Sequence, residues 1–231
     1  MRTVDTSPAQ SQARLLRLLR GHPSGVLLAG QLLAVLIYPF IGSSIPGRAA
    51  LGALGTVLVL VALYAVRRTP ALAWVALVLG APAVVFNALE VAWPDSDVVL
   101  LGSALLHAPF YFYVSYGMIR YLFHDQKVTR DEIFATGAAF TVVAWGFAYL
   151  YVAVQVLWPD SFGPGQRSFF ELLYLSFTTL TSVGLSDLVP VTPHARSIVI
   201  VEQVAGVMYV ALVVARMVGL TVIRPEVEQE G

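Results

Sequence analysis

The sequence predicts an all-α transmembrane protein with six membrane-spanning helices and a shorter helical segment between the fifth and the sixth. Of its 231 residues, 58% are hydrophobic and only 12% are charged, whereas soluble domains carry about 25% charged residues. Six apolar runs approach the roughly 20 residues that a helix needs to cross a bilayer core. They lie near 25–42, 49–66, 71–92, 98–123, 131–158 and 195–222.

The formal net charge is zero and the chain has no cysteine. The balanced charge argues against a nucleic-acid partner, which would call for a basic surface. Without cysteine, thiol, disulfide and zinc-thiolate chemistry are excluded. The four histidines are scattered along the chain, and no Ser/His/Asp set or phosphate-binding glycine loop is present. We therefore do not expect an enzyme or a bound cofactor, and membrane lipids are the expected surroundings.

The basic residues predict the orientation. If the N-terminus is cytoplasmic, eleven of the 14 Lys and Arg residues lie on that side and three, Arg48, Arg167 and Arg196, lie outside. This bias follows the positive-inside rule and predicts a multi-pass cell-membrane protein with both termini in the cytoplasm. Residues 1–24 would then form a cytoplasmic N-terminal segment and residues 223–231 a short cytoplasmic tail.

The first four apolar runs, within residues 25–123, predict a four-helix membrane domain. A voltage sensor carries several arginines at every third position of its fourth helix, and the fourth run here has only Arg120, near its inner end. Steep voltage gating is therefore not expected. Asn87, Glu90 and His107 either share a polar pocket or make separate interhelical hydrogen bonds, with the glutamate near water; we favour the second interpretation.

The fifth connection, 159–194, is long and contains an apolar-aromatic segment at 167–181. At about 1.5 Å per residue this segment is too short to cross the membrane. The polar string SVGLSD and Pro190 follow it, and non-helical backbone at membrane depth must be buried in protein or line a watery cavity. The sequence predicts a re-entrant half-helix with an extended return. Its partially negative C-terminal end favours a cation.

The stretch TTLTSVGLSDLVPVTPHAR, residues 178–196, resembles the pore loop of tetrameric potassium-channel-type cation channels, TTxTTVGYGDxxPxTxxGR. Residues 178–184 match at nearly every position, with Ser182 in place of threonine. The further matches in register are Asp187, Pro190, Thr192 and Arg196. The last apolar run resembles the inner helix of that family. The resemblance implies a pore domain over 131–222, with outer helix, pore helix, filter and inner helix, in a homotetramer.

The resemblance also implies site residues. The ion-binding filter would be Thr181, Ser182, Val183, Gly184, Leu185, Ser186 and Asp187, with K⁺ or Na⁺ bound at Ser182, Val183 and Gly184 by carbonyl oxygens that replace its hydration shell. Filter support would come from Tyr174, Leu175, Thr178, Thr179 and Glu202. The gating hinge would be Gly206, and the cavity would be lined by Val207, Val210, Val214 and Val218.

Two departures from the pattern matter. Leu185 stands where tyrosine or phenylalanine is usual, and Ser186 stands where the second glycine is usual. Alternate residues of the potassium filter are left-handed, which glycine accepts freely. A serine there costs roughly 1–2 kcal/mol per subunit unless the backbone takes another path. We expect apolar packing by Tyr174 and Leu175 to replace the tyrosine's hydrogen bond, and weaker discrimination against Na⁺ than a GYG filter gives.

Glu202 lies one turn before Gly206, where the family usually has apolar residues. We favour a brace behind the filter, bonded to Thr178, Thr179 or a loop amide. The alternative is a pH-sensitive gate, because burial favours the neutral form of a carboxyl group. Arg216, near the inner mouth, is expected to extend to the membrane interface and not to ring the pore.

The leading hypothesis is a potassium-permeable cation channel. The single-glycine loop VGLS also resembles those of Trk/Ktr-type potassium uptake proteins, which place four unequal repeats in one chain where this chain has one. A potassium uptake subunit with an unseen cytoplasmic regulatory subunit is therefore the second hypothesis. A non-conducting membrane scaffold or sensor that retains the pore fold is the third.

Overall fold

The structure is a computed structural model that describes residues 23–41, 57, 70–122 and 130–222. Its helices are α2 (Pro23–Ile41), α4 (Pro70–Ala92), α5 (Asp97–Leu122), α6 (Arg130–Leu157), α7 (Phe169–Leu180) and α8 (Pro193–Val222). These residues form helices and connecting loops and contain no strand, which confirms the all-α class for the described part of the chain. A helix satisfies its backbone hydrogen bonds within one segment, as an apolar surrounding requires.

Three of the described helices are long and apolar enough to cross a membrane: Asp97–Arg120, Ile133–Leu157 and Pro193–Arg216. They correspond to the predicted segments 98–123, 131–158 and 195–222. The apolar parts of α2 and α4, Ser24–Phe40 and Leu77–Ala92, are shorter. The predicted segment 49–66, most of the N-terminal segment 1–24 and the tail 223–231 lie outside the described residues. The count of six spans stays a prediction.

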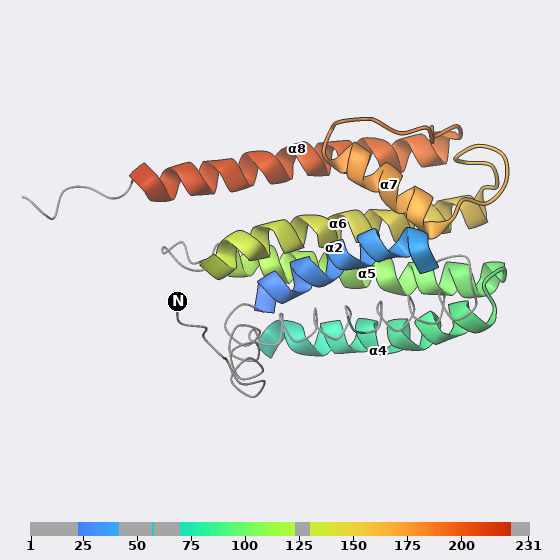
Figure 1. Ribbon diagram of the computed structural model, residues 1–231, viewed down its shortest axis with the longest axis horizontal. Helices are drawn as coiled ribbons and strands as arrows, with labels where there is room; N and C mark the ends of the chain where they lie inside the picture. Colours follow the sequence, from blue (N-terminus) through green and yellow to red (C-terminus); the bar gives the residue numbers. More distant parts are fainter. Residues whose placement is uncertain (1–22, 42–56, 58–69, 123–129, 223–231) are drawn as a thin grey trace, which may run out of the picture.

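Helix α6 is the centre of the arrangement, because it packs against α2, α5, α7 and α8, while α4 packs against α5. The long helices run side by side along the longest axis of the molecule (Figure 1). The main buried cluster surrounds α6, with side chains from α2, α5, α7 and α8, and includes Phe110, Val114, Tyr151 and Leu172. By contrast, α8 leaves most of its side chains exposed in the single chain.

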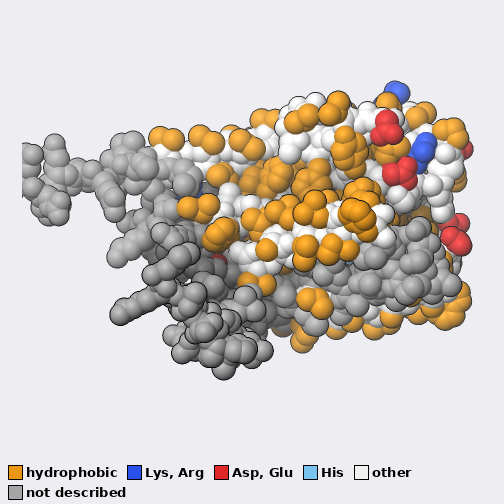
Figure 2. Space-filling view, in the orientation of Figure 1, with side chains coloured by type: hydrophobic (Ala, Val, Ile, Leu, Met, Phe, Trp, Pro, Cys, Tyr) orange, Lys and Arg blue, Asp and Glu red, His pale blue; other side chains and the backbone are white. Residues whose placement is uncertain are grey.

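The short helix α7 and the loop after it make an out-and-back excursion beside α8. In Figure 1, α7 slants inward from the end at which α6 finishes, and the chain returns to that same end before α8 begins. The observed α7, Phe169–Leu180, lies within the half-helix predicted at 167–181. Figure 2 shows charged side chains gathered at this end and apolar side chains along the length of the helices. This distribution suits a protein whose helices lie in a membrane.

Candidate filter loop and its supports

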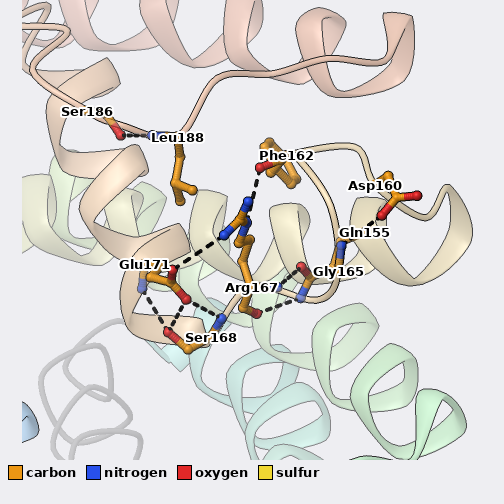
Figure 3. Close-up of polar contacts among 9 residues, drawn as sticks. All are labelled: Gln155, Asp160, Phe162, Gly165, Arg167, Ser168, Glu171, Ser186 and Leu188. Atoms are coloured by element: carbon orange, nitrogen blue, oxygen red, sulfur yellow. Dashed lines mark hydrogen bonds and ion pairs between the residues drawn. The ribbon is translucent and has the colours of Figure 1, made fainter.

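The start of α7 is fixed by a capping box and by α6 (Figure 3). The Ser168 hydroxyl accepts a hydrogen bond from the Glu171 amide at 3.3 Å, and the Glu171 carboxylate accepts one from the Ser168 amide at 2.8 Å. The Gln155 side chain donates to the Arg167 carbonyl at 3.0 Å and accepts from the Arg167 amide at 2.9 Å. These bonds satisfy backbone groups that a helix start otherwise leaves open and hold α7 against the end of α6.

The loop wraps over the other end of α7. The amides of Thr181, Ser182 and Gly184 donate to the carbonyls of Phe177, Thr179 and Thr178 at 3.1, 2.9 and 2.9 Å, respectively. The Thr181 hydroxyl also donates to the Phe177 carbonyl, at 2.6 Å. Three of the four carbonyls that end α7 therefore have partners in the chain. Residues 181–184 take their shape from this cap.

The left-handed residues of the loop are Ser182, with φ of 60°, and Gly184, with φ of 66°. Ser186 is not left-handed, so the strain that we predicted for it does not arise. Its amide donates to the Gly184 carbonyl at 3.1 Å, and its hydroxyl accepts from the Leu188 amide at 3.1 Å. The backbone thus takes another path at Ser186, and the strained serine is Ser182 instead, since a side chain at positive φ costs free energy.

We expect Ser182→Gly to stabilise the folded protein, because glycine accepts this φ without a steric penalty. The gain of roughly 1–2 kcal/mol is offset in part by about 0.4–1 kcal/mol of added freedom in the unfolded chain. Ser182→Val should destabilise the protein, since a β-branched residue is the least tolerated at positive φ. Thermal unfolding of the purified protein in detergent measures both. A glycine variant no more stable than the valine variant would contradict the assignment.

The predicted filter residues form an exposed face of the single chain. Val183 and Leu185 are 66% and 70% exposed, while Leu188 is buried and fixes the return of the loop. Of the two residues predicted to pack against Leu185, Leu175 is buried within the chain and Tyr174 is 43% exposed. Leu185 thus stays exposed within one chain, and the predicted apolar packing around it would need a neighbouring copy.

Glu202 is completely buried and joins three helices. The Tyr151 hydroxyl of α6 donates to one of its carboxyl oxygens, and the Ser176 hydroxyl of α7 contacts the other. Glu202 therefore packs against α7, and its bonding partners differ from the expected Thr178, Thr179 or loop amide. Thr179 instead interacts with the Tyr151 hydroxyl, and the Thr178 hydroxyl donates to the Leu175 carbonyl at 2.9 Å.

Gly206 lies where α8 crosses the last residue of α7. A Cβ atom built on it would lie 2.0 Å from the Leu180 carbonyl oxygen and 2.8 Å from the carbonyl carbon, far inside any ordinary contact. The structure therefore shows a close-packing requirement for this glycine, and its role as a hinge stays a prediction. The predicted cavity residues Val207, Val210, Val214 and Val218 are all more than half exposed in the single chain.

The polar residues of α4 and α5 are partly brought together. His107 is buried, and its Nδ1 lies 3.0 Å from both the hydroxyl and the carbonyl oxygen of Ser103. Glu90 also interacts with the Ser103 side chain. Glu90 and His107 therefore share a partner that sequence analysis did not single out. Asn87 is buried, but its Nδ2 has no hydrogen-bond partner among the residues that the structure describes.

An aromatic contact leads from this cluster to α7. The His107 ring stacks on Tyr149 with centroids 4.4 Å apart, and Tyr149 contacts Phe169, the first residue of α7, at 4.7 Å. Tyr38 of α2 stacks on Phe170 at 4.5 Å. The start of α7 thus packs directly against Tyr38 of α2, which lies outside the predicted pore domain, and is connected to His107 of α5 through Tyr149 of α6.

Comparison with known proteins agrees with this geometry. Residues 137–222, which comprise most of α6, all of α7, the loop and α8, match a family described as ion channel. No curated protein and no solved structure gives a significant match. The fold, the loop and the match together support an ion-channel class of membrane protein. The matched stretch includes every predicted filter, support and cavity residue.

Proposed function

We propose that the chain is one subunit of a homotetrameric, potassium-permeable cation channel whose filter is the loop 181–187. The observation that carries the proposal is the left-handed, capped loop at the end of α7, within the residues that match ion channels. Backbone carbonyls of Ser182, Val183 and Gly184 would replace the water of a dehydrated K⁺ or Na⁺. One chain supplies one such loop, so a closed ring needs several copies.

The exposed surface of the single chain supports assembly. The loop and the valines of α8 are uncovered, whereas α6 is buried among the other helices. Four copies around an axis would place the loops together and let the α8 helices line a common path.

The altered outer part of the filter supports reduced selectivity. Ser186 follows a path different from the left-handed one that a second glycine allows, and Leu185 lacks the tyrosine hydroxyl. The inner positions keep Ser182, Val183 and Gly184. We therefore propose that K⁺ is favoured over Na⁺ less strongly than in GYG filters, and that gating is not steeply voltage-dependent.

The test is ion flux from liposomes that contain the purified protein, measured for K⁺, Rb⁺ and Na⁺, together with the oligomer mass in detergent. We expect flux of all three ions and the mass of four subunits. No flux under any condition of pH, voltage or lipid would favour the scaffold hypothesis, and the mass of a single subunit would overturn the ring.

The double variant Leu185→Tyr/Ser186→Gly should raise the K⁺/Na⁺ permeability ratio, because it restores both the aromatic residue and the second glycine. A rise of about tenfold corresponds to 1.4 kcal/mol of added discrimination, and reversal potentials measure it. Val191→Tyr, an exposed position beyond the filter, is the control and should leave the ratio unchanged. An unchanged ratio in the double variant would refute the altered-filter proposal.

A further inference from the structure

We infer that Glu202 carries a proton in the folded protein. This proton completes a chain of hydrogen bonds from Tyr151 through Glu202 and Ser176 to Ala144, called the lock below, which joins α6, α7 and α8. The protonation state stands independently of the proposed function. The consequence for conduction rests on that function.

The argument begins with the hydroxyl of Ser176. Its oxygen lies 2.8 Å from the Ala144 carbonyl oxygen of α6 and also contacts Oε1 of Glu202. A hydroxyl has one proton to donate, and a carbonyl oxygen can only accept. When Ser176 donates to Ala144, its contact with Oε1 is a hydrogen bond only if the carboxyl group supplies the proton. Both bonds are made together when Glu202 is a neutral acid that donates to Ser176.

The other carboxyl oxygen fits the same assignment. Oε2 accepts the hydrogen bond from the Tyr151 hydroxyl, as the carbonyl oxygen of a neutral acid does. The chain of bonds then runs from Tyr151 through Glu202 and Ser176 to Ala144. It starts and ends on α6 and passes through α8 and α7, so each helix is held by the other two.

The surroundings favour the neutral form as well. Glu202 and Ser176 are both completely buried, and a buried carboxylate without a cationic partner is strongly disfavoured. In the part of the chain that the structure describes, Glu202 contacts two hydroxyl groups and forms no ion pair with a basic side chain. The facing groups are Tyr151 from α6 and Ser176 from α7, and Gln203 beside it on α8 is exposed. The nearby end of α7 carries partial negative charge.

Loss of this proton would break the lock. The Ser176 hydroxyl has one proton, so it could then bond either the Ala144 carbonyl or the Glu202 carboxylate, but not both. The negative charge of Glu202 would also be buried behind the loop. Because Glu202 lies one turn from Gly206, where α8 touches the last residue of α7, the loosened contact would act on the base of the filter loop. Raising the pH should therefore lower both the stability of the protein and its ion flux.

Infrared spectroscopy of the purified protein tests the protonation directly. The wild type should show the C=O stretch of a protonated carboxylic acid at neutral pH, and Glu202→Gln should lose that signal. Glu171→Gln, which changes an exposed carboxylate at the start of α7, is the control and should retain it. Ser176→Ala, which removes the acceptor, should shift the band instead of removing it, and serves if the glutamine variant does not fold. A carboxylate signal in place of the acid band would overturn the inference.

The pH dependence tests the lock. Thermal stability of the wild type should fall as the pH rises above the ordinary pKa of a glutamate, about 4.3, because the unfolded chain then releases a proton that the folded chain keeps. Glu202→Gln, whose amide can make the same bonds, should lose that dependence. If the proposed function holds, flux should follow the same pattern. Stability that does not change with pH, or changes equally in the glutamine variant, would overturn the lock. Absence of flux in every variant, with the acid band intact, would refute the channel and leave the protonation standing.

Discussion

Replacing Gly206 with alanine is expected to displace α8 from the end of α7 and to remove most of the ion flux. The new methyl group would lie 2.0 Å from the backbone carbonyl oxygen of Leu180 and 3.1 Å from its Cα. A backbone atom cannot rotate away, so one of the two helices must shift. Overpacking of this kind costs typically 1–3 kcal/mol, and we expect about 3 kcal/mol per subunit. Thermal stability and liposome flux measure the effect.

Gly102→Ala is the matched control. Its Cβ atom would also meet a close neighbour, the Phe86 ring at 2.4 Å, but a ring on a flexible side chain can move. Alanine also gains about 1 kcal/mol over glycine within a helix, so the stability should change little. If the two variants lose equal stability, the close contact between position 206 and the Leu180 carbonyl group does not explain the loss in Gly206→Ala.

Replacing Gly184 with alanine is the second large expected effect, and it acts through the backbone alone. A Cβ atom on Gly184 would meet no described residue within 4 Å, yet Gly184 has a φ of 66°. An L-residue in this conformation costs roughly 1–2 kcal/mol. Four copies in one ring would together add roughly 4–8 kcal/mol to the conducting conformation. We expect K⁺ flux to fall below detection.

Gly165 offers a control of the same kind. It also has positive φ, 78°, with open space around its Cα, but it lies in the loop before α7. Gly165→Ala should impose a similar local strain and leave the flux largely intact. Equal loss of flux in both variants would mean that the strain acts on folding in general and not on the filter.

The short helix α7 was predictable because it depends on a local property, while its re-entry into a membrane stays a prediction. An apolar segment too short to span, followed by a polar loop, restricts the chain to an inward turn and return, and α7 begins within two residues of the predicted start. Three carbonyls at its end accept hydrogen bonds from loop amides and so shape the loop, but which amides reach them depends on backbone angles that the sequence pattern does not reveal. The sequence pattern placed strain at Ser186, and the structure places it at Ser182.

The supports behind the loop were less predictable, because they join residues far apart in the chain. Glu202 stood out as an acid in an apolar helix, yet its partners Tyr151 and Ser176 are separated from it by 51 and 26 positions. A tyrosine or serine in an apolar helix carries no local signal for such a contact. Likewise, the family pattern predicted a hinge at Gly206. Its steric role becomes visible only where α8 crosses the end of α7.

Two further contacts join α6 and α8. At one end, Trp158, just after α6, stacks on His194 at the start of α8, with ring centroids 4.0 Å apart. Toward the other end, the Tyr209 hydroxyl donates to the Thr136 carbonyl at 2.6 Å. A rigid tilt of α8 would break one of these contacts, whereas movement beyond Tyr209 would keep both. Together with the Tyr151–Glu202 hydrogen bond that lies between them, these contacts fix the course of α8 along α6 from His194 to Tyr209, so a tilt of α8 as a rigid unit is resisted at three places.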